Sequence, residues 1–389
     1  MAIVNISLVG GQSMPVYRGF EEPQKPDKII LIYSDMTYEE AKSIGDKSGL
    51  PFELKQFDAF NYSSILKSGE ILLANLEGNK VIINITSGTK PWAVAFSLLA
   101  INRENCTIIY FDQNSIMHDL THQYLDNSLH DLDIATIFRY NNQSVPNHTL
   151  FTDYTQEDEN VLNSVIKLRS KNYTDFNYLT SFENRNWKRD FDNSTILHPQ
   201  QTLPSGSMIL YDKPQNKVFI KLKNRYLGYT EKTLHSPHVE KIVFNTGWFE
   251  YEVALLMSQW QHCKEIWMNV AIPYSNNNTK NEIDVMVNTG KKLIFVECKT
   301  QIKDTTDIDK FRSAVRNFGG WSSKAIFITR ASMTNYAREK CEDNGIIFFS
   351  LEDVVPQRQA LNLTTSDIKA RRQTALFRLL ENEILNSNT

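Results

Sequence analysis

The sequence predicts an α/β protein with two separately folded parts, and three observations support this fold class. Residues 1–145 contain short runs that are apolar on both faces, such as Val4–Val9 and Lys28–Tyr33. Stretches with helical periodicity separate these runs, as expected for a doubly wound parallel sheet. A second group of strands and helices begins at Gly247. The length of 389 residues is sufficient for two or three domains of ordinary size.

The predicted N-terminal domain, residues 1–145, alternates strands with helices in regular order. Further strands are expected at Val81–Ile85 and Thr107–Phe111, and helices at Tyr38–Lys47 and Pro91–Asn102. Small polar residues follow three of the four strands. Ligands of doubly wound sheets collect at the carboxyl ends of the strands. We therefore expect a binding site at that edge.

Residues 146–240 are predicted to connect the two ordered parts. A helix is expected over Asp153–Ser170, and a hairpin over Met208–Lys223 that turns near Pro214–Lys217. The stretch Asp175–Gln201 is polar and rich in asparagine and aromatic residues. We expect it to be a loop.

The C-terminal domain, residues 241–389, is predicted to begin with an amphipathic helix over Trp248–Trp260. An asparagine-rich loop, Ser275–Asn281, precedes the most polar of its strands. The expected strands are Glu265–Ala271, Glu282–Val287, Lys292–Lys299, Lys324–Thr329 and Ile346–Ser350, and the later helices are Ile308–Phe318, Met333–Asn344 and Thr365–Glu383.

Composition excludes several classes of protein. With 42 Lys and Arg against 45 Asp and Glu, the net charge of −3 argues against a binder held by bulk positive charge, although a local basic groove remains compatible with a nuclease. The four cysteines form no CxxC pair, and the start has no basic region of a signal peptide. The longest apolar run, Val94–Ile101, falls far short of the ~20 residues of a membrane span. We expect a cytoplasmic protein that does not enter membranes.

Three charged residues stand in otherwise apolar strands of the C-terminal domain. The two-residue period of a strand puts Glu297 and Lys299 on one face, and Asp284 points away from its apolar neighbours on the preceding strand. Converging carboxylates repel each other unless a cation compensates. Oxygen ligands suit Mg²⁺ or Mn²⁺, and no Cys/His set suits zinc. The alternative is an exposed edge hairpin whose charges are solvated or ion-paired.

This pattern, Asp-x12-Glu-x-Lys behind an acidic helix, resembles the PD-(D/E)xK nuclease superfamily over Gly247–Ser350. The resemblance implies a restriction-endonuclease-like α/β domain. It implies that Asp284, Glu297 and the main-chain carbonyl of Cys298 bind Mn²⁺ or Mg²⁺. It further implies that Lys299 orients the attacking water and stabilises the phosphorane-like transition state.

The acidic residue of the first helix is ambiguous. Glu250 and Glu252 face about 200° apart on a helix, so only one of them can point to the site. The glycine–tryptophan context before Glu250 is similar to the superfamily's version, and Glu250 is therefore preferred. Gln301, Lys303 and Arg316 are further candidates for contact with nucleic-acid phosphate.

The segment from Thr86 to Lys90 lies between a buried strand and a helix in the N-terminal domain. Its hydroxyl residues and glycine can present donors to an anion at the helix N-terminus. A lysine at this end opposes the helix dipole, which makes sense if an anion binds there. The alternative is ordinary Ser/Thr capping with an exposed lysine. No GxxxxGK[ST] or GxGxxG motif is present.

The Thr-x-Gly-Thr-Lys motif between strand and helix resembles that of CARF (CRISPR-associated Rossmann fold) domains, over residues 1–145. Many relatives have glycine at the position of Ser87. The resemblance implies a homodimer that binds cyclic oligoadenylate across its two copies. The residues it implies as ligand contacts are Gln12, Ser13, Ser34, Asp35, Thr86, Ser87, Gly88, Thr89 and Lys90.

The order of the two motifs resembles the CRISPR ancillary nucleases of type III systems. This implies antiviral defence by a nuclease that cyclic tetra-adenylate activates, with single-stranded DNA or RNA, or nicked duplex, as substrate. Two alternatives remain: a non-catalytic sensor of cyclic nucleotides, and a constitutive repair or restriction nuclease whose N-terminal half only dimerises.

Overall fold

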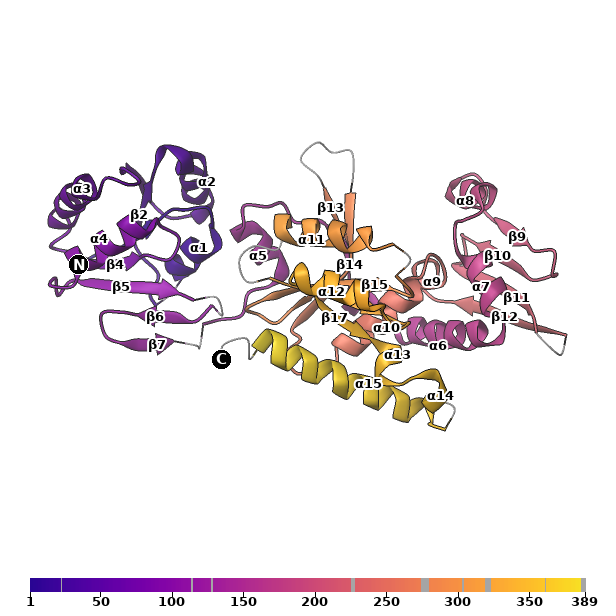
Figure 1. Ribbon diagram of the computed structural model, residues 1–389. Helices are drawn as coiled ribbons and strands as arrows, with labels where there is room; N and C mark the ends of the chain where they lie inside the picture. Colours follow the sequence, from indigo (N-terminus) through magenta and orange to yellow (C-terminus); the bar gives the residue numbers. More distant parts are fainter. Residues whose placement is uncertain are drawn as a thin grey trace. The chain divides into compact units, whose positions relative to one another are not determined.

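The computed structural model describes residues 1–389 except 22, 113–114, 127–128, 225–227, 274–279, 303, 319–322, 361 and 386–389. It confirms the α/β class (Figure 1). Lys303 and most of the expected asparagine-rich loop lie outside the described residues. The chain forms two compact units. The first comprises Met1–Val145, Asn288–Leu293 and Val315–Ser323, and the second comprises Pro146–Val287, Ile294–Ala314 and Lys324–Thr389.

The first unit is built on a seven-stranded sheet in the order β3-β2-β1-β4-β5-β6-β7. Its strands are β1 (Ile3–Leu8), β2 (Lys28–Tyr33), β3 (Phe52–Gln56), β4 (Lys80–Asn84), β5 (Cys106–Phe111), β6 (Met117–Asp119) and β7 (Tyr124–Asp126). The first five are parallel, and β6 and β7 are added in antiparallel fashion. Strand β1 therefore lies between β2 and β4, which brings three strand ends side by side.

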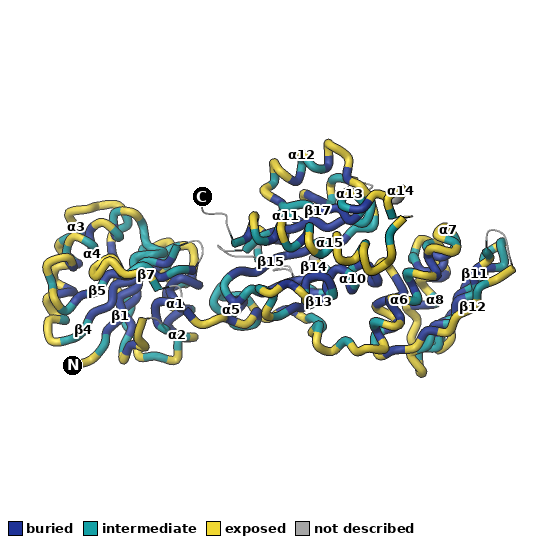
Figure 2. Tube along the Cα trace, turned by 90° about the horizontal axis from the view of Figure 1, so that it is seen from below, coloured by how far each residue is buried: buried dark blue, intermediate teal, exposed yellow. Residues whose placement is uncertain are grey.

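Helices cover both faces of this sheet (Figures 1 and 2). One face packs against α3 (Tyr62–Ala74) and α4 (Lys90–Ala100), and the other against α1 (Met14–Glu21) and α2 (Tyr38–Ser48). Of these elements, α1, β3 and α3 were not expected from the sequence. Strand β3 has no fully buried residue, so it lacks the apolar run that marks its neighbours.

The second unit contains a six-stranded sheet in the order β17-β16-β15-β14-β13-β8. Its strands are β8 (Asn147–Leu150), β13 (Glu265–Pro273), β14 (Lys280–Asn288), β15 (Leu293–Lys299), β16 (Lys324–Thr329) and β17 (Ile347–Ser350). Strands β15, β16 and β17 are parallel. The associated helices include α10 (Gly247–Met257), α11 (Thr306–Phe318), α12 (Asn335–Asp343) and α15 (Thr365–Leu380). No helix within the described ranges is long and apolar enough to cross a membrane.

The segment expected as a connector is an ordered part of the second unit. Its four-stranded antiparallel sheet runs β12-β11-β10-β9, and it packs against α6 (Gln156–Lys171) and α9 (Val239–Val243). The strands are β9 (Gln200–Thr202), β10 (Met208–Asp212), β11 (Lys217–Lys223) and β12 (Tyr229–His235). The expected hairpin is confirmed as β10 and β11.

The expectation of a loop over Asp175–Gln201 is wrong. Two helices, α7 (Tyr173–Thr180) and α8 (Arg185–Asp192), occupy much of this stretch. Asn184, one of the asparagines that suggested a loop, caps α8, where its side chain accepts a hydrogen bond from the amide of Trp187, and Asn172, just before the stretch, caps α7 in the same way. Three of the aromatic residues are core, since Phe176 is fully buried and Trp187 and Phe191 are 3 % and 9 % exposed.

A buried carboxylate joins the beginning of this segment to its end. Asp158 is fully buried at the start of α6, where it accepts hydrogen bonds from the Thr155 amide at 2.7 Å and from His238 Nδ1 at 3.0 Å. Burial by itself would raise the pKa of Asp158, but the hydrogen bonds from Thr155, His238 and Ser236 outweigh it and hold the pKa below the ordinary value.

We expect Asp158→Asn to lower the free energy of unfolding by about 2 kcal/mol at pH 7, since a charged acceptor of buried hydrogen bonds is lost. The folded pKa is depressed, so the stabilisation is present above the unfolded pKa of about 4 and disappears as the pH falls through the folded value. Urea denaturation at pH 7 and pH 3.5 measures both effects. The exposed Asp153→Asn is the control. An equal loss for both variants would contradict the assignment.

Candidate functional site

Strands β14 and β15 bring three of the predicted catalytic residues together. The strands are neighbours in the sheet. The main-chain amide of Cys298 donates to Asp284 Oδ2 at 2.7 Å, which fixes the carboxylate of β14 against β15. On β15, Lys299 Nζ lies 2.6 Å from Glu297 Oε1. The Glu297 side chain is 12 % exposed and that of Lys299 is 34 % exposed, so the pair lies at the protein surface without being fully solvated.

Helix α10 brings Glu250 to the same cluster and turns Glu252 away from it. The negative charge of Glu250 helps to raise the pKa of Asp284. This requires that the two carboxyl groups lie close together. Glu252 instead pairs with Arg330 at 2.8 Å. The helix can begin here because Gly247 has no side chain: a Cβ at this position would lie 1.7 Å from the carbonyl oxygen of Lys241.

Burial and mutual repulsion shift the pKa values of the cluster. Burial is the largest cause that raises the pKa of Glu250, to about 8, and the charge of Glu282 adds to it. Burial and the neighbouring carboxylates likewise raise the pKa of Asp284 well above its ordinary value. The pKa of Glu297 is also raised by burial, although Lys299 partly offsets this. Burial lowers the pKa of Lys299, but the surrounding carboxylates outweigh it, so the net shift is upward and the amine stays charged.

The donor set fits a hard divalent cation. Among the described residues, no three His, Cys, Asp or Glu side chains are grouped tightly enough to hold an ion by themselves. Two carboxylates, Asp284 and Glu297, together with a main-chain carbonyl would therefore have to share it with water, which suits Mg²⁺ and Mn²⁺. The excess of buried negative charge is itself an argument for a cation. An open cavity of about 150 Å³ beside Glu297 is lined by Glu282, Asp307 and Lys310 as well.

Asn269 is a site residue that the sequence-based reasoning missed. Its Nδ2 donates to Glu250 Oε2 at 3.2 Å, and its Oδ1 is buried with no hydrogen-bond partner among the described residues. It has a positive φ of 50°, at an irregularity of β13 between Met268 and Ala271. Such a bulge re-aims a side chain. An asparagine inside the apolar run Ile266–Ile272 was a signal that could have found it.

The further candidates for phosphate contact are not brought into the cluster. Gln301 and Arg316 are both exposed, and neither has a hydrogen bond or ion pair with the carboxylates in the part of the chain that the structure describes. Two residues that the sequence reasoning did not single out act on the cluster instead. The charge of Glu282 helps to raise the pKa values of Glu250 and Glu297, and the charge of Asp307 helps to raise that of Glu297.

In the first unit, the loops after β1 and β4 are in direct contact. Ser87 Oγ donates to the main-chain carbonyl of Gln12 at 2.7 Å. The two backbones approach so closely that a Cβ on Gly10 would lie 1.7 Å from the carbonyl oxygen of Ser87. Ser34 and Asp35 follow β2, the other neighbour of β1. The structure thus places most of the predicted ligand contacts along one edge of the sheet.

Several of these side chains are engaged within the unit. Ser13 is buried and its hydroxyl donates to the carbonyl of Tyr140 at 2.5 Å. Thr86 donates to Asn84 and accepts from the amide of Phe111. Thr89 accepts from the amide of Trp92 and thereby caps α4.

Lys90 is the predicted contact most available to a ligand. It is exposed at the first position of α4, and no hydrogen bond or ion pair joins it to another residue in the part of the chain that the structure describes. Its charge opposes the dipole of α4 with no internal compensation. An anion at this position would remove the conflict, as the helix N-terminus also favours it.

Comparison with protein families identifies both ends of the chain. The family described as the Card1 CARF domain matches residues 4–137, and the family described as the Card1-like endonuclease domain matches residues 239–361. Together they cover about two thirds of the chain. No curated protein matches it.

Two solved structures are similar over almost the whole length. Can2 from Sulfobacillus thermosulfidooxidans, in complex with cyclic tetra-adenylate, has a TM-score of 0.65 at 19 % identity, covering 98 % of this chain and 99 % of that one. VC1899 from Vibrio cholerae has a TM-score of 0.68 at 14 % identity, covering 98 % of each chain. At these identities the similarity concerns the fold. The chain therefore carries a Card1 CARF domain followed by a Card1-like endonuclease domain, the organisation of an endonuclease of type III CRISPR systems that cyclic oligoadenylate activates.

Proposed function

We propose that the cluster of Asp284, Glu297 and Lys299 hydrolyses phosphodiester bonds with Mn²⁺ or Mg²⁺, and that cyclic tetra-adenylate switches the activity on. The observation that carries this proposal is the convergence of carboxyl groups with raised pKa values around one lysine, from the middle of β14 and the end of β15. Such a cluster is unfavourable by itself, and a divalent cation would offset the repulsion.

The proposed metal ligands are Asp284, Glu297 and the main-chain carbonyl of Cys298. When bound, the ion would polarise the scissile phosphate and lower the pKa of the attacking water. The contact between the Cys298 amide and Asp284 Oδ2 supports this set, because it holds the first ligand beside the third. Either Mn²⁺ or Mg²⁺ suits these oxygens.

Lys299 has the properties of a group that stabilises developing negative charge. Its pKa is raised, so the amine carries a positive charge at neutral pH. Glu297 holds the amine in place at 2.6 Å. We assign to Lys299 the orientation of the attacking water and the stabilisation of the phosphorane-like transition state. Glu250, whose Oε2 is fixed by Asn269, would position water at the opposite side of the cluster.

The CARF loops are the proposed site of cyclic tetra-adenylate, the compound bound in the Can2 structure. The residues proposed as contacts are Gln12, Ser34, Asp35, Ser87, Gly88, Thr89 and Lys90, with Ser13 and Thr86 supporting the loops from inside. The uncompensated charge of Lys90 at the start of α4 supports an anionic ligand. Binding would shift the protein towards a cleavage-competent state, which requires that the ligand binds that state more tightly.

A homodimer is part of this proposal, and helix α4 supports it. One face of α4 is buried in the sheet's core through residues such as Trp92 and Phe96. The opposite face is also apolar, since Val94, Leu98 and Ile101 are 52 %, 56 % and 68 % exposed. Three apolar side chains at helical spacing on a solvent-facing helix are typical of a surface that another chain covers.

We further propose that the substrate is single-stranded DNA or RNA, or nicked duplex, and that the protein acts in the cytoplasm. All four cysteines are free thiols, which suits a reducing compartment.

Replacing a metal ligand should separate cleavage from ligand binding. We expect Glu297→Gln and Asp284→Asn to lower the cleavage rate at least 100-fold. Each change removes a proposed ligand of the cation that would balance the negative charge of the transition state. Their affinity for cyclic tetra-adenylate should be unchanged. Lys90→Ala should do the converse: its affinity for cyclic tetra-adenylate falls, and saturating ligand restores cleavage.

The assay uses single-stranded DNA, RNA and plasmid with Mn²⁺, across cyclic oligoadenylates of different ring size, and isothermal calorimetry measures ligand affinity. Normal cleavage by Glu297→Gln would refute the catalytic assignment. Equal cleavage with and without every cyclic oligoadenylate would favour the constitutive nuclease instead.

Metal binding should stabilise the protein more at high pH. The folded pKa of Glu250, about 8, lies above the ordinary value of a glutamate. Its contribution to stability is therefore complete below about pH 4 and is lost as the pH rises towards 8. A cation bound by Asp284 and Glu297 relieves the repulsion that these carboxylates exert on Glu250. It also competes with protons for the oxygens of Asp284 and Glu297. We expect the rise in melting temperature with saturating Mn²⁺ to be a few degrees larger at pH 8.5 than at pH 6.

The matched control is the double variant Asp284→Asn/Glu297→Gln, which should melt at the same temperature with and without Mn²⁺. A shift that is independent of pH, or that persists in the double variant, would place the ion elsewhere.

The two carboxylates of α10 can be distinguished by kinetics. Glu250 lies in the cluster and Glu252 does not, so we expect kcat of Glu250→Gln to fall at least tenfold below that of Glu252→Gln. Single-turnover cleavage with activator present measures this. The reverse order would identify Glu252 as the helix acid.

A further inference from the structure

Two arginines flank one buried tryptophan in the second unit. Arg169 of α6 stacks on the Trp248 ring at 3.8 Å from its centroid, and Arg330, which follows β16, lies 5.0 Å from the same centroid. Trp248 is 2 % exposed. The indole therefore holds two guanidinium groups in defined positions. Two arginines on an open surface would be freer to move.

The charges of this cluster are not balanced. Arg372 of α15 also lies near enough that Arg330 helps to lower its pKa, after the effect of burial. The carboxylate within salt-bridge distance is Glu252, at 2.8 Å from Arg330. Arg169 is only 6 % exposed, and its Nε is buried with no hydrogen-bond partner among the described residues. A buried guanidinium with an unused donor is costly, and an added anion would reduce that cost.

The main chain of Arg330 lies beside that of the proposed catalytic lysine. The amide of Arg330 donates to the carbonyl of Lys299 at 3.1 Å, so the two residues leave neighbouring strands at the same edge of the sheet. Lys299 pairs with Glu297, whereas Arg330 pairs with Glu252.

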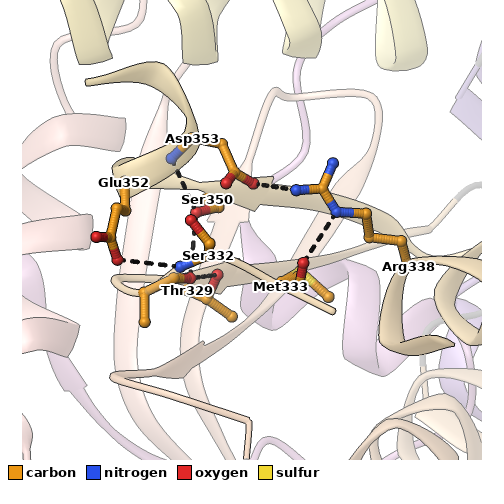
Figure 3. A network of polar contacts seen from close by, with 8 residues as sticks. Thr329, Ser332, Met333, Arg338, Ser350, Glu352 and Asp353 are labelled. Atoms are coloured by element: carbon orange, nitrogen blue, oxygen red, sulfur yellow. Dashed lines mark hydrogen bonds and ion pairs between the residues drawn. The ribbon is translucent and has the colours of Figure 1, made fainter. Parts of the chain in front are cut away.

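The loop that carries Arg330 is held rigidly (Figure 3). The hydroxyls of Thr329 and Ser350 both donate to the carbonyl of Ala331, at 2.8 and 3.1 Å. The amide of Ser332 donates to Glu352, whose own amide donates to the carbonyl of Arg330 at 3.1 Å. A backbone fixed on both sides of Arg330 limits the positions that its side chain can reach.

We propose that Arg330, supported by Arg169 and Trp248 and assisted by Arg372, binds a backbone phosphate of the nucleic acid that flanks the scissile phosphate. This inference rests on the proposed function of the same domain. Arginine suits the role because its planar group binds phosphate with two parallel hydrogen bonds. Glu252 is the internal counter-ion that the phosphate competes with. Arg330 is thus a substrate-positioning residue outside the catalytic cluster.

The test combines variants of the protein with changes in the substrate. Arg330→Ala is compared with Arg330→Lys, Glu252→Gln and a control, Arg378→Ala, which removes an exposed arginine from α15. Cleavage of single-stranded DNA and RNA oligonucleotides is measured with Mn²⁺ and cyclic tetra-adenylate. Binding is measured separately by fluorescence anisotropy in the Glu297→Gln background, so the inference is tested even if cleavage is not observed.

We expect Arg330→Ala to raise KM and Kd about tenfold with a smaller effect on kcat, and the slope of log K against log salt to fall by about 0.7. Arg330→Lys should restore part of the affinity. Glu252→Gln should bind more tightly than the wild type, because it removes the competitor of the phosphate. Arg378→Ala should behave as the wild type. Melting temperatures identify any variant that loses affinity only because it unfolds.

The decisive comparison uses oligonucleotides in which one phosphate at a time is replaced by an uncharged methylphosphonate. At one position beside the cleaved bond, the wild type should lose about tenfold in affinity, while Arg330→Ala should lose almost nothing there. The inference is overturned if Arg330→Ala binds and cleaves like Arg378→Ala, or if its loss is the same at every methylphosphonate position. Absence of cleavage by the wild type in all conditions would instead refute the proposed function.

Discussion

Repulsion among the carboxyl groups of β14, β15 and α10 is the constraint on which the second unit's chemistry depends. Asp284, Glu297 and Glu250 approach one another in a part of the sheet that is otherwise apolar, and burial raises the pKa of each. One lysine cannot neutralise three carboxylates. The surrounding fold must therefore supply enough stability to hold them, through buried neighbours such as Phe295 and Val296. An unbalanced charge held by a stable scaffold is ready to bind a cation without rearrangement.

The two ends of the chain handle phosphate chemistry by different physical means. In the first unit, the backbone donors at the start of α4 and the single positive charge of Lys90 can bind an anion directly. In the second unit, carboxylates outnumber the lysine at the proposed catalytic cluster, so a phosphate there would be repelled unless a cation offsets the negative charge. The net charge of −3 is an average over these arrangements. It limits non-specific binding to nucleic acid but says little about either site.

Local pattern predicted the fold class and the location of the cluster, but it did not predict the supporting residues. The period of two along Lys292–Lys299 was sufficient to pair Glu297 with Lys299, and the apolar runs marked most strands. Asn269 was missed because its role depends on a bulge with positive φ, which strand periodicity does not reveal. The helices α7 and α8 were missed because asparagine is typical of both loops and helix caps, and only the tertiary core shows which role applies.

The two glutamates of α10 show how one helix can serve two charged sites. Glu250 and Glu252 are two residues apart, so they point to different sides of the helix. The sequence predicts that they diverge, but it does not predict what each one faces. Glu250 joins the carboxylates, where it adds to the demand for a cation. Glu252 faces Arg330, where it partly offsets an excess of positive charge. Trp248, one turn away, fixes the arginines that Glu252 alone could not hold. A helix start that approaches Lys241 too closely for any residue but Gly247 thus sets the geometry of the negative cluster and of the positive one together, and a nucleic-acid strand with evenly spaced phosphates is the kind of ligand that can use both.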